Sequence, residues 1–241
     1  MAELNIPRGN QGLLTLLEEA PQVAIEDRAT GLNYVEQEWT NQATAFRPEY
    51  HSKVRGLVVA QQRRAQEIGE RRAVVDELDI YVRDFMVVLK RRVSREKLPP
   101  HYYSFFNLPQ DGTLPNPTAT DAIINWAETL AQGDADAVTA GYEPMANPSA
   151  AQVAALWEQA RAESADLPAA ERELDIIQDE VEAMRQQATE LVHDLADQLN
   201  FRLRKLEAPD RRRIIRRYGF QYRYDQGDPV DIEDTGDDNA A

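Results

Sequence analysis

Basic and aromatic side chains alternate in one short segment of the sequence, residues 211–224. Planar guanidinium groups bind phosphate or carboxylate through paired hydrogen bonds, and aromatic rings stack on nucleic-acid bases. The segment therefore has the chemistry of a partner-binding or anion-binding site. The residues selected from it are Arg211, Arg212, Arg213, Arg216, Arg217, Tyr218 and Tyr222.

Several interpretations of this segment stay open. Cations are favoured at helix C-termini and aromatic residues at a helix end can pack beneath it, which would be a structural role. The segment can instead be a surface for a protein partner, or a site for RNA or another polyanion. An intramolecular role is also open, because residues 225–238 hold seven acidic residues and no basic one. A weaker counterpart of the pattern occurs at residues 90–106.

A metal site is a further candidate chemistry. Glu190 and His193 have the i, i+3 spacing by which carboxylate-bridged di-iron bundles place Glu and His on one helical face. Such a site needs a second pair of this kind, yet His51 and His101 have no Glu three residues before them. We therefore expect neither a metal site nor a cofactor, and keep a carboxylate-bridged metal protein as the second alternative.

Composition narrows the function classes. The chain of 241 residues has no cysteine, so disulfides, thiolate metal sites and cysteine nucleophiles are excluded. We find no glycine-rich phosphate loop, no Gly-x-Ser-x-Gly motif and no zinc spacing. The net charge of −15 argues against wholesale binding to nucleic acid or anionic membranes. We expect a non-enzymatic, cytoplasmic protein.

The elements that must carry these residues are helices. An apolar spacing of three and four residues predicts a long amphipathic helix over 169–206, whose seam would be covered by other helices or by another chain. This seam consists of Leu174, Ile177, Val181, Met184, Ala188, Leu191, Leu195, Leu199, Leu203 and Leu206. A second long helix is predicted over 50–97, ending before Pro99.

Prolines and turns mark the remaining elements. We expect Pro48 to end or kink a short helix over 33–46, and Pro168 to form a turn before the helix over 169–206. Residues 99–117 are rich in proline and aromatic residues and predict an extended crossover packed against the helices. A short helix is predicted over 120–131, followed by loop or weak helix over 133–147.

The two halves of the sequence share an outline. A shift of 110 residues aligns nine identical residues over 57–99, including Leu57 with Leu167, Arg92 with Arg202 and Pro99 with Pro209. Any two amphipathic helices share some identical residues at apolar and alanine positions. An internal duplication of helical hairpins is therefore one interpretation of the sequence, and chance similarity is the other.

These patterns predict an all-α antiparallel helical bundle with coiled-coil character. The expected parts are an N-terminal half (1–117), a C-terminal half (118–224) and a disordered acidic tail (225–241). We expect a structural or adaptor protein that binds a protein partner or associates with itself, and no binding to membranes. Binding of RNA or another phosphate-rich ligand through 211–224 is the first alternative.

Overall fold

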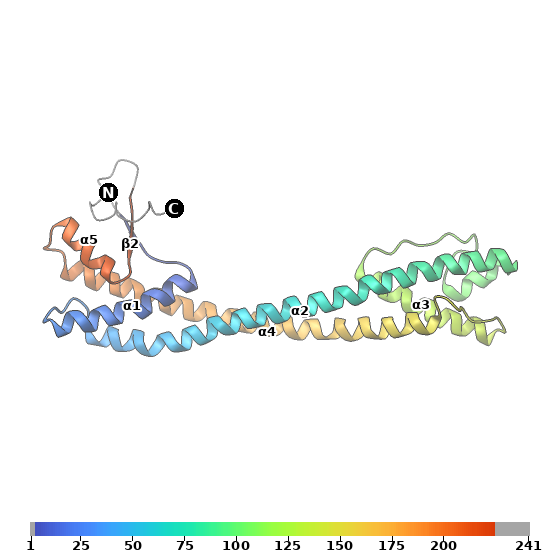
Figure 1. Cartoon of the computed structure of the whole chain (residues 1–241), viewed down its shortest axis with the longest axis horizontal. Coiled ribbons are helices and arrows are strands. Elements are labelled where there is room, and N and C mark those ends of the chain that lie inside the picture. Colours follow the sequence, from blue (N-terminus) through green and yellow to red (C-terminus); the bar gives the residue numbers. More distant parts are fainter. Residues whose placement is uncertain (1–2, 225–241) are drawn as a thin grey trace, which may run out of the picture. The chain divides into compact units, whose positions relative to one another are not determined.

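The computed structural model describes residues 3–224 and consists almost entirely of helices, which confirms the expected fold class (Figure 1). Two strands of three residues form a small antiparallel sheet, with Leu4 opposite Tyr222. The elements in chain order are β1 (Glu3–Asn5), α1 (Asn10–Ala29), α2 (Gln37–Glu96), the 3-10 helix η1 (Pro100–Phe106), α3 (Thr120–Thr139), α4 (Ala150–Arg202), α5 (Ala208–Arg217) and β2 (Gln221–Arg223). Residues 225–241, expected to be disordered, lie outside the described residues.

The two long helices are longer than the sequence predicted. Pro48 lies inside α2 and Pro168 lies inside α4, so Pro48 does not end a helix and the predicted turn at Pro168 was wrong. The alternative of a kink at Pro48 stays a prediction. A proline inside a helix removes one hydrogen bond and costs roughly 3 kcal/mol. Burial of the apolar seam on both sides of each proline offsets that cost. α3 likewise continues to Thr139, through residues expected to be loop or weak helix.

The chain divides into two compact units, and each takes part of both long helices. The described part of unit 1 comprises residues 3–59 and 175–224, and unit 2 comprises residues 60–174. The division into halves at residue 117, drawn from the sequence, stays a prediction. No helix over residues 3–224 is both long enough and apolar enough to cross a membrane.

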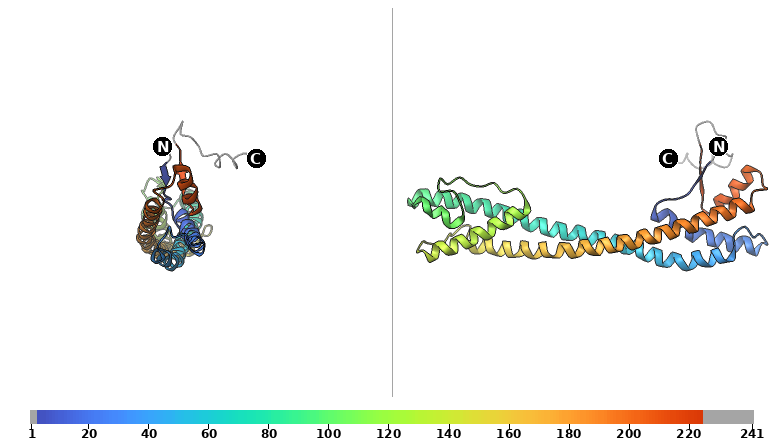
Figure 2. Two further views of the ribbon diagram at one scale, coloured as in Figure 1. Left: turned by 90° about the vertical axis from the view of Figure 1, so that its left-hand side faces the viewer. Right: turned by 180° about the vertical axis from the view of Figure 1, so that it is seen from behind.

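In unit 1, α1 lies along the first part of α2, as both Figure 1 and Figure 2 show. The hydroxyl of Tyr50 on α2 donates a hydrogen bond of 2.9 Å to Asn10, the first residue of α1. The indole N–H of Trp39 donates to the backbone oxygen of Leu191 on α4 at 2.8 Å. The core between these helices is apolar, with the side chains of α1 at Leu13, Leu14, Leu16, Leu17 and Ala20 all buried.

In unit 2, η1 and the crossover that follows it, residues 107–119, pack against α2 and α3, as the sequence predicted. Residues 100–106, expected to be extended, instead form the 3-10 helix η1. The rings of Tyr102 and Phe106 are fully buried, and Tyr102 contacts Tyr142 edge to face at 4.7 Å between ring centroids. α3 approaches η1 so closely that a Cβ at Gly133 would lie 2.6 Å from the backbone oxygen of Phe105. Only glycine fits at that position without a shift of the backbone.

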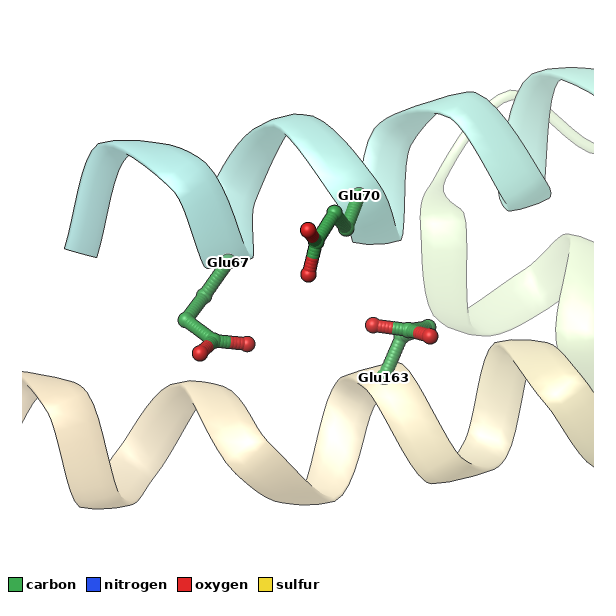
Figure 3. Close-up of side chains that lie close together, drawn as sticks. All are labelled: Glu67, Glu70 and Glu163. Atoms are coloured by element: carbon green, nitrogen blue, oxygen red, sulfur yellow. The ribbon is translucent and has the colours of Figure 1, made fainter. Parts of the chain in front are cut away.

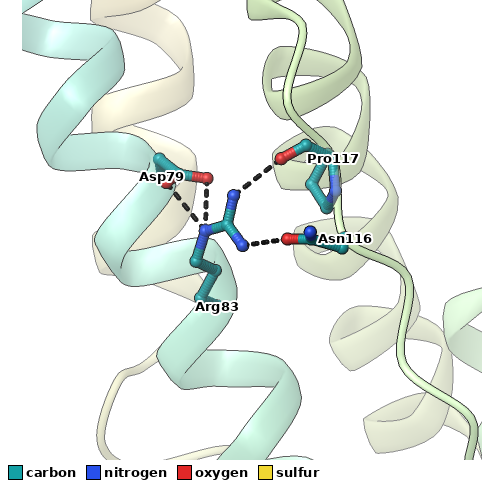
Figure 4. A network of polar contacts seen from close by, with 4 residues as sticks. All are labelled: Asp79, Arg83, Asn116 and Pro117. Carbon is teal, nitrogen blue, oxygen red and sulfur yellow. Dashed lines mark hydrogen bonds and ion pairs between the residues drawn. The ribbon is translucent and has the colours of Figure 1, made fainter.

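A single arginine holds the crossover on α2 (Figure 4). The Nε of Arg83 donates to both carboxylate oxygens of Asp79, at 2.7 and 2.8 Å. Its two terminal nitrogens donate to the side chain of Asn116 and, at 2.7 Å, to the backbone oxygen of Pro117. The guanidinium therefore ties the end of the crossover to the helix that precedes it.

The two units share several features at the same shift of 110 residues, and the internal duplication stays a prediction. α1 and α3 are both 20 residues long and begin 110 positions apart. Each ends at a left-handed glycine, Gly31 (φ 83°) or Gly141 (φ 93°). The next amide donates back across the turn in both cases, from Leu32 to Asp27 at 2.8 Å and from Tyr142 to Ala137 at 3.0 Å. These bonds form a Schellman motif in each unit.

The seam of the long helices follows the same 110-residue shift. Four buried residues of α2 correspond to four buried residues of α4: Leu78 to Ala188, Val82 to Val192, Phe85 to Leu195 and Leu89 to Leu199. Exposed ion pairs fix the antiparallel register of the two helices within each unit. Lys53 contacts Glu180 at 2.7 Å in unit 1, and Arg63 contacts Glu173 at 2.7 Å in unit 2.

The close approach at Gly133 yields a stability prediction. Gly133→Ala should lower the free energy of unfolding by about 1–3 kcal/mol, because the new methyl group meets backbone atoms of η1. Gly69→Ala on α2 is the matched control, since nothing lies within 4 Å of its Cβ position. It should instead stabilise the helix by about 1 kcal/mol. Urea denaturation followed by circular dichroism measures both, and an equal effect of the two substitutions would contradict the packing described.

Candidate functional site

The Arg-rich segment forms α5 in unit 1. Pro209 stands at the start of the helix, where a missing N–H costs nothing, and Asp210 lies in the first turn. Arg216 and Arg217 occupy the last turn, where the partial negative charge of the helix C-terminus favours cations. The side chain of Ile215 is fully buried, so α5 packs on unit 1 by one apolar face and carries its arginines on the others.

A buried carboxylate anchors the end of α5. Asp27, near the end of α1, has a side chain that is 4% exposed. One of its oxygens accepts a hydrogen bond of 2.8 Å from the guanidinium of Arg217, and the other accepts one of 2.8 Å from the hydroxyl of Tyr218. These two hydrogen bonds offset the desolvation cost of burying the Asp27 carboxylate.

Tyr218 belongs to the core rather than to a binding surface. Its ring is fully buried, and its burial, together with its hydrogen bond to the Asp27 carboxylate, holds the pKa of the hydroxyl well above the usual value. The hydroxyl therefore stays protonated and continues to donate to Asp27. Arg217 and Tyr218, both selected from the sequence as partner- or anion-binding residues, have a structural role here.

The other selected residues lie on the outside of α5 or beside it. Arg213 is exposed and pairs with Asp210 at 3.1 Å, while Arg211 and Arg212 are half-buried. Arg216 donates to the hydroxyl of Tyr224, and its guanidinium lies 5.6 Å from the ring centroid of Tyr222, the residue of β2 that faces Leu4. α5 and β2 therefore bring these residues to one end of unit 1.

The weaker counterpart at residues 90–106 is a packed helix end in unit 2. The guanidinium of Arg92 donates to the backbone oxygen of Glu143 at 2.6 Å and to Glu96 at 3.0 Å, and lies 6.0 Å from the ring centroid of Tyr102. Asp134 is buried nearby, where it accepts a hydrogen bond of 3.0 Å from the amide of Met145. Burial raises the pKa of Asp134 above its ordinary value.

Sequence reasoning missed both buried aspartates, although a signal was present. Asp27 continues the apolar stripe of Leu13, Leu16, Ala20 and Ala24 at helical spacing. Asp134 continues the stripe of Ile123, Ala127 and Leu130 in the same way. A carboxylate on the apolar face of an amphipathic helix indicates a buried polar contact.

Glu190 and His193 line an open pocket of about 1050 Å³ in unit 1. One wall is a polar face of α4, and the opposite wall is the extended segment over residues 3–8 together with Arg223. The lining combines carboxylates with guanidinium groups, among them Glu182 and Arg185, which pair at 2.6 Å. Both residues of the metal alternative are exposed there, and that alternative stays a prediction.

Three glutamates of unit 2 lie close enough together to share a cation (Figure 3). Glu67 and Glu70 on α2 point toward Glu163 on α4, with ligand oxygens within 4.8 Å of one another. Glu67 is also 4.0 Å from Arg63, and Glu70 accepts a hydrogen bond of 2.8 Å from Gln66. Neighbouring side chains on α2 thus offset part of the repulsion. The sequence contained no signal for this cluster, because its residues come from two helices that lie far apart in the sequence.

Comparison of the chain with known protein families, with curated proteins and with solved structures finds no match.

The anchor at Asp27 yields a second prediction. Asp27→Ala removes the acceptor of two charge-assisted hydrogen bonds and should lower the free energy of unfolding by about 2–3 kcal/mol. Asp210→Ala is the matched control, because its ion pair with Arg213 is exposed and should contribute less than about 1 kcal/mol. Chemical denaturation of the three proteins measures the difference. Equal stability of Asp27→Ala and the unsubstituted protein would show that α5 is not anchored in this way.

Proposed function

We propose that this protein is a non-enzymatic structural or adaptor bundle that binds protein partners, a second copy of itself included. The observation that carries the proposal is the exposure of three aliphatic side chains at neighbouring levels of the two long helices of unit 1. Val58 and Val59 on α2 are 48% and 63% exposed, and Ile176 on α4 is 61% exposed. Exposure of each of these apolar side chains to water is unfavourable, and burial against a partner would remove this free-energy cost.

These three residues, the aliphatic patch, lie beyond the reach of α1. α1 begins at Asn10, level with Tyr50, and the patch lies about two turns further along α2. The ion pair of Lys53 with Glu180 places Val59 close to the level of Ile176 in the antiparallel register. The patch therefore lies on the stretch of α2 and α4 that pairs the two helices with each other and that α1 does not reach.

The chemistry of the patch favours an apolar helix face as its partner. Aliphatic side chains on two antiparallel helices present ridges into which the ridges of a third or fourth helix pack. Charged residues also flank the patch, among them Arg63 on α2 and Asp179 on α4. They would orient the partner without contributing much affinity.

Substitution of the patch tests this proposal. Val59→Glu with Ile176→Glu should weaken self-association at least about tenfold, because a charge replaces each buried aliphatic contact. Ile80→Glu is the matched control, since Ile80 is 59% exposed on α2 in unit 2. Sedimentation velocity over a range of micromolar concentrations measures the association. A strictly monomeric unsubstituted protein, together with no partner that is lost on substitution of the patch, would refute the proposal.

A second candidate function is binding of a polyanion at α5. Its support is the local charge: residues 202–224 hold nine Arg and Lys against two acidic residues, in a chain with a net charge of −15. The residues that would bind the polyanion are Arg211, Arg212, Arg213 and Arg216, with Tyr222 beside them. Arg217 contributes less, because it also binds the buried Asp27.

Salt dependence distinguishes this candidate. Affinity for a labelled single-stranded RNA should fall steeply with salt concentration. It should rise when residues 225–241 are removed, because that segment contains seven acidic residues. Replacement of Arg211, Arg212 and Arg213 by alanine should reduce the slope of log affinity against log salt by about 2. The same replacement of Lys90, Arg91 and Arg95 is the control. No binding at low salt without residues 225–241 would eliminate this function.

A further inference from the structure

Each compact unit is assembled from the chain on both sides of the crossover. Unit 1 joins α1 and the first part of α2 to the last part of α4 and α5. Unit 2 joins the last part of α2 and η1 to α3 and the first part of α4. The core of either unit is therefore an interface between an N-terminal repeat, residues 3–106, and a C-terminal repeat, residues 120–224.

Specific contacts between the repeats form outside the crossover. In unit 1, Asp27 of the N-terminal repeat binds Arg217 and Tyr218 of the C-terminal repeat. In unit 2, the backbone of Phe105 packs against Gly133, and Arg92 donates to Glu143. Both sets of contacts would form equally well if the two repeats belonged to different chains.

The crossover, residues 107–119, is the covalent link between the repeats. It is held in unit 2 by Arg83, which binds Asn116 and Pro117, and by the close contact of Tyr103 with Gly112. Thirteen extended residues can span about 40 Å, so the crossover can connect two separate units once these contacts open.

We propose that two copies of this chain exchange repeats, so that the N-terminal repeat of each copy pairs with the C-terminal repeat of the other. The proposal goes beyond the proposed function: it adds a second mode of self-association, which depends on the core of the units and not on the aliphatic patch. The exchanged dimer has the same buried contacts between repeats as the monomer. The two differ in the conformation of the crossover. The high effective concentration of linked repeats favours the monomer in dilute solution, and concentrated refolding favours the exchanged dimer.

A crosslink between the repeats tests exchange directly, because the chain has no cysteine. The pair Lys53→Cys and Glu180→Cys replaces an exposed contact of 2.7 Å between α2 and α4 in unit 1, one residue from each repeat. The full-length protein is refolded from urea at low and at high concentration, and monomer and dimer are separated by size. Each fraction is treated with a short bismaleimide and run on a denaturing gel.

The monomer should give a crosslink within one chain, and the dimer should give a covalent pair of chains. Absence of a dimer after concentrated refolding, or a dimer whose crosslinks stay within single chains, overturns the proposal. A single-cysteine protein carrying Lys53→Cys alone shows the background of crosslinks between neighbouring surfaces.

Release of the crossover provides an independent readout. Arg83→Ala should raise the fraction of exchanged dimer about tenfold, because it removes the contacts of the guanidinium with Asn116 and Pro117. Arg72→Ala is the matched control, since it removes an exposed ion pair of α2, with Asp76, that includes no residue of the crossover. An equal dimer fraction in both variants contradicts the role given to the crossover.

The patch variant Val59→Glu with Ile176→Glu separates this proposal from the proposed function. Exchanged dimer should form undiminished in that variant, while reversible association of the native protein is lost. Loss of the exchanged dimer in the patch variant would show that the dimer forms through the patch and would refute exchange.

Discussion

Everything in this structure depends on the apolar seams of α2 and α4, which neither helix can bury alone. A helix of 60 residues with one apolar stripe is stable in water only when other elements cover that stripe. Fully buried side chains such as Leu78 and Leu89 on α2, and Val192 and Leu199 on α4, mark where this cover is complete. The antiparallel pairing of the two helices supplies part of it, and each unit must supply the rest.

The two units solve this problem with the same plan and different chemistry. Each adds a 20-residue helix that ends in a glycine turn, and each is closed by the segment that follows a long helix. Unit 1 uses α5, held by the ionic contact at Asp27, whereas unit 2 uses the aromatic residues of η1 and the Arg83 contacts. The features that recur in both units are buried packing positions. The features that differ are those that close each unit.

Helical spacing predicted the long helices and the packed aromatic crossover because those features follow from local patterns. It failed at Pro168 and in allowing a helix end at Pro48, since burial of a long seam outweighs the loss of single hydrogen bonds and the sequence does not show how much is buried. It could not reveal the pairing of β1 with β2 or of Asp27 with Arg217, whose partners lie about 190 positions or more apart. Of the residues selected in the Arg-rich segment, Arg217 and Tyr218 bind Asp27, and binding of a partner or anion by the segment stays a prediction.

Native-state hydrogen exchange tests most directly whether each unit is one cooperative body made from both halves of the chain. Loosening α5 by Asp27→Ala should lower protection together in residues 37–59 of α2 and 175–202 of α4. Protection in residues 60–96 and 150–174 should stay unchanged, because they belong to the other unit. Loss of protection along the whole of α2, or confined to the part of the chain that precedes the crossover, would contradict this account.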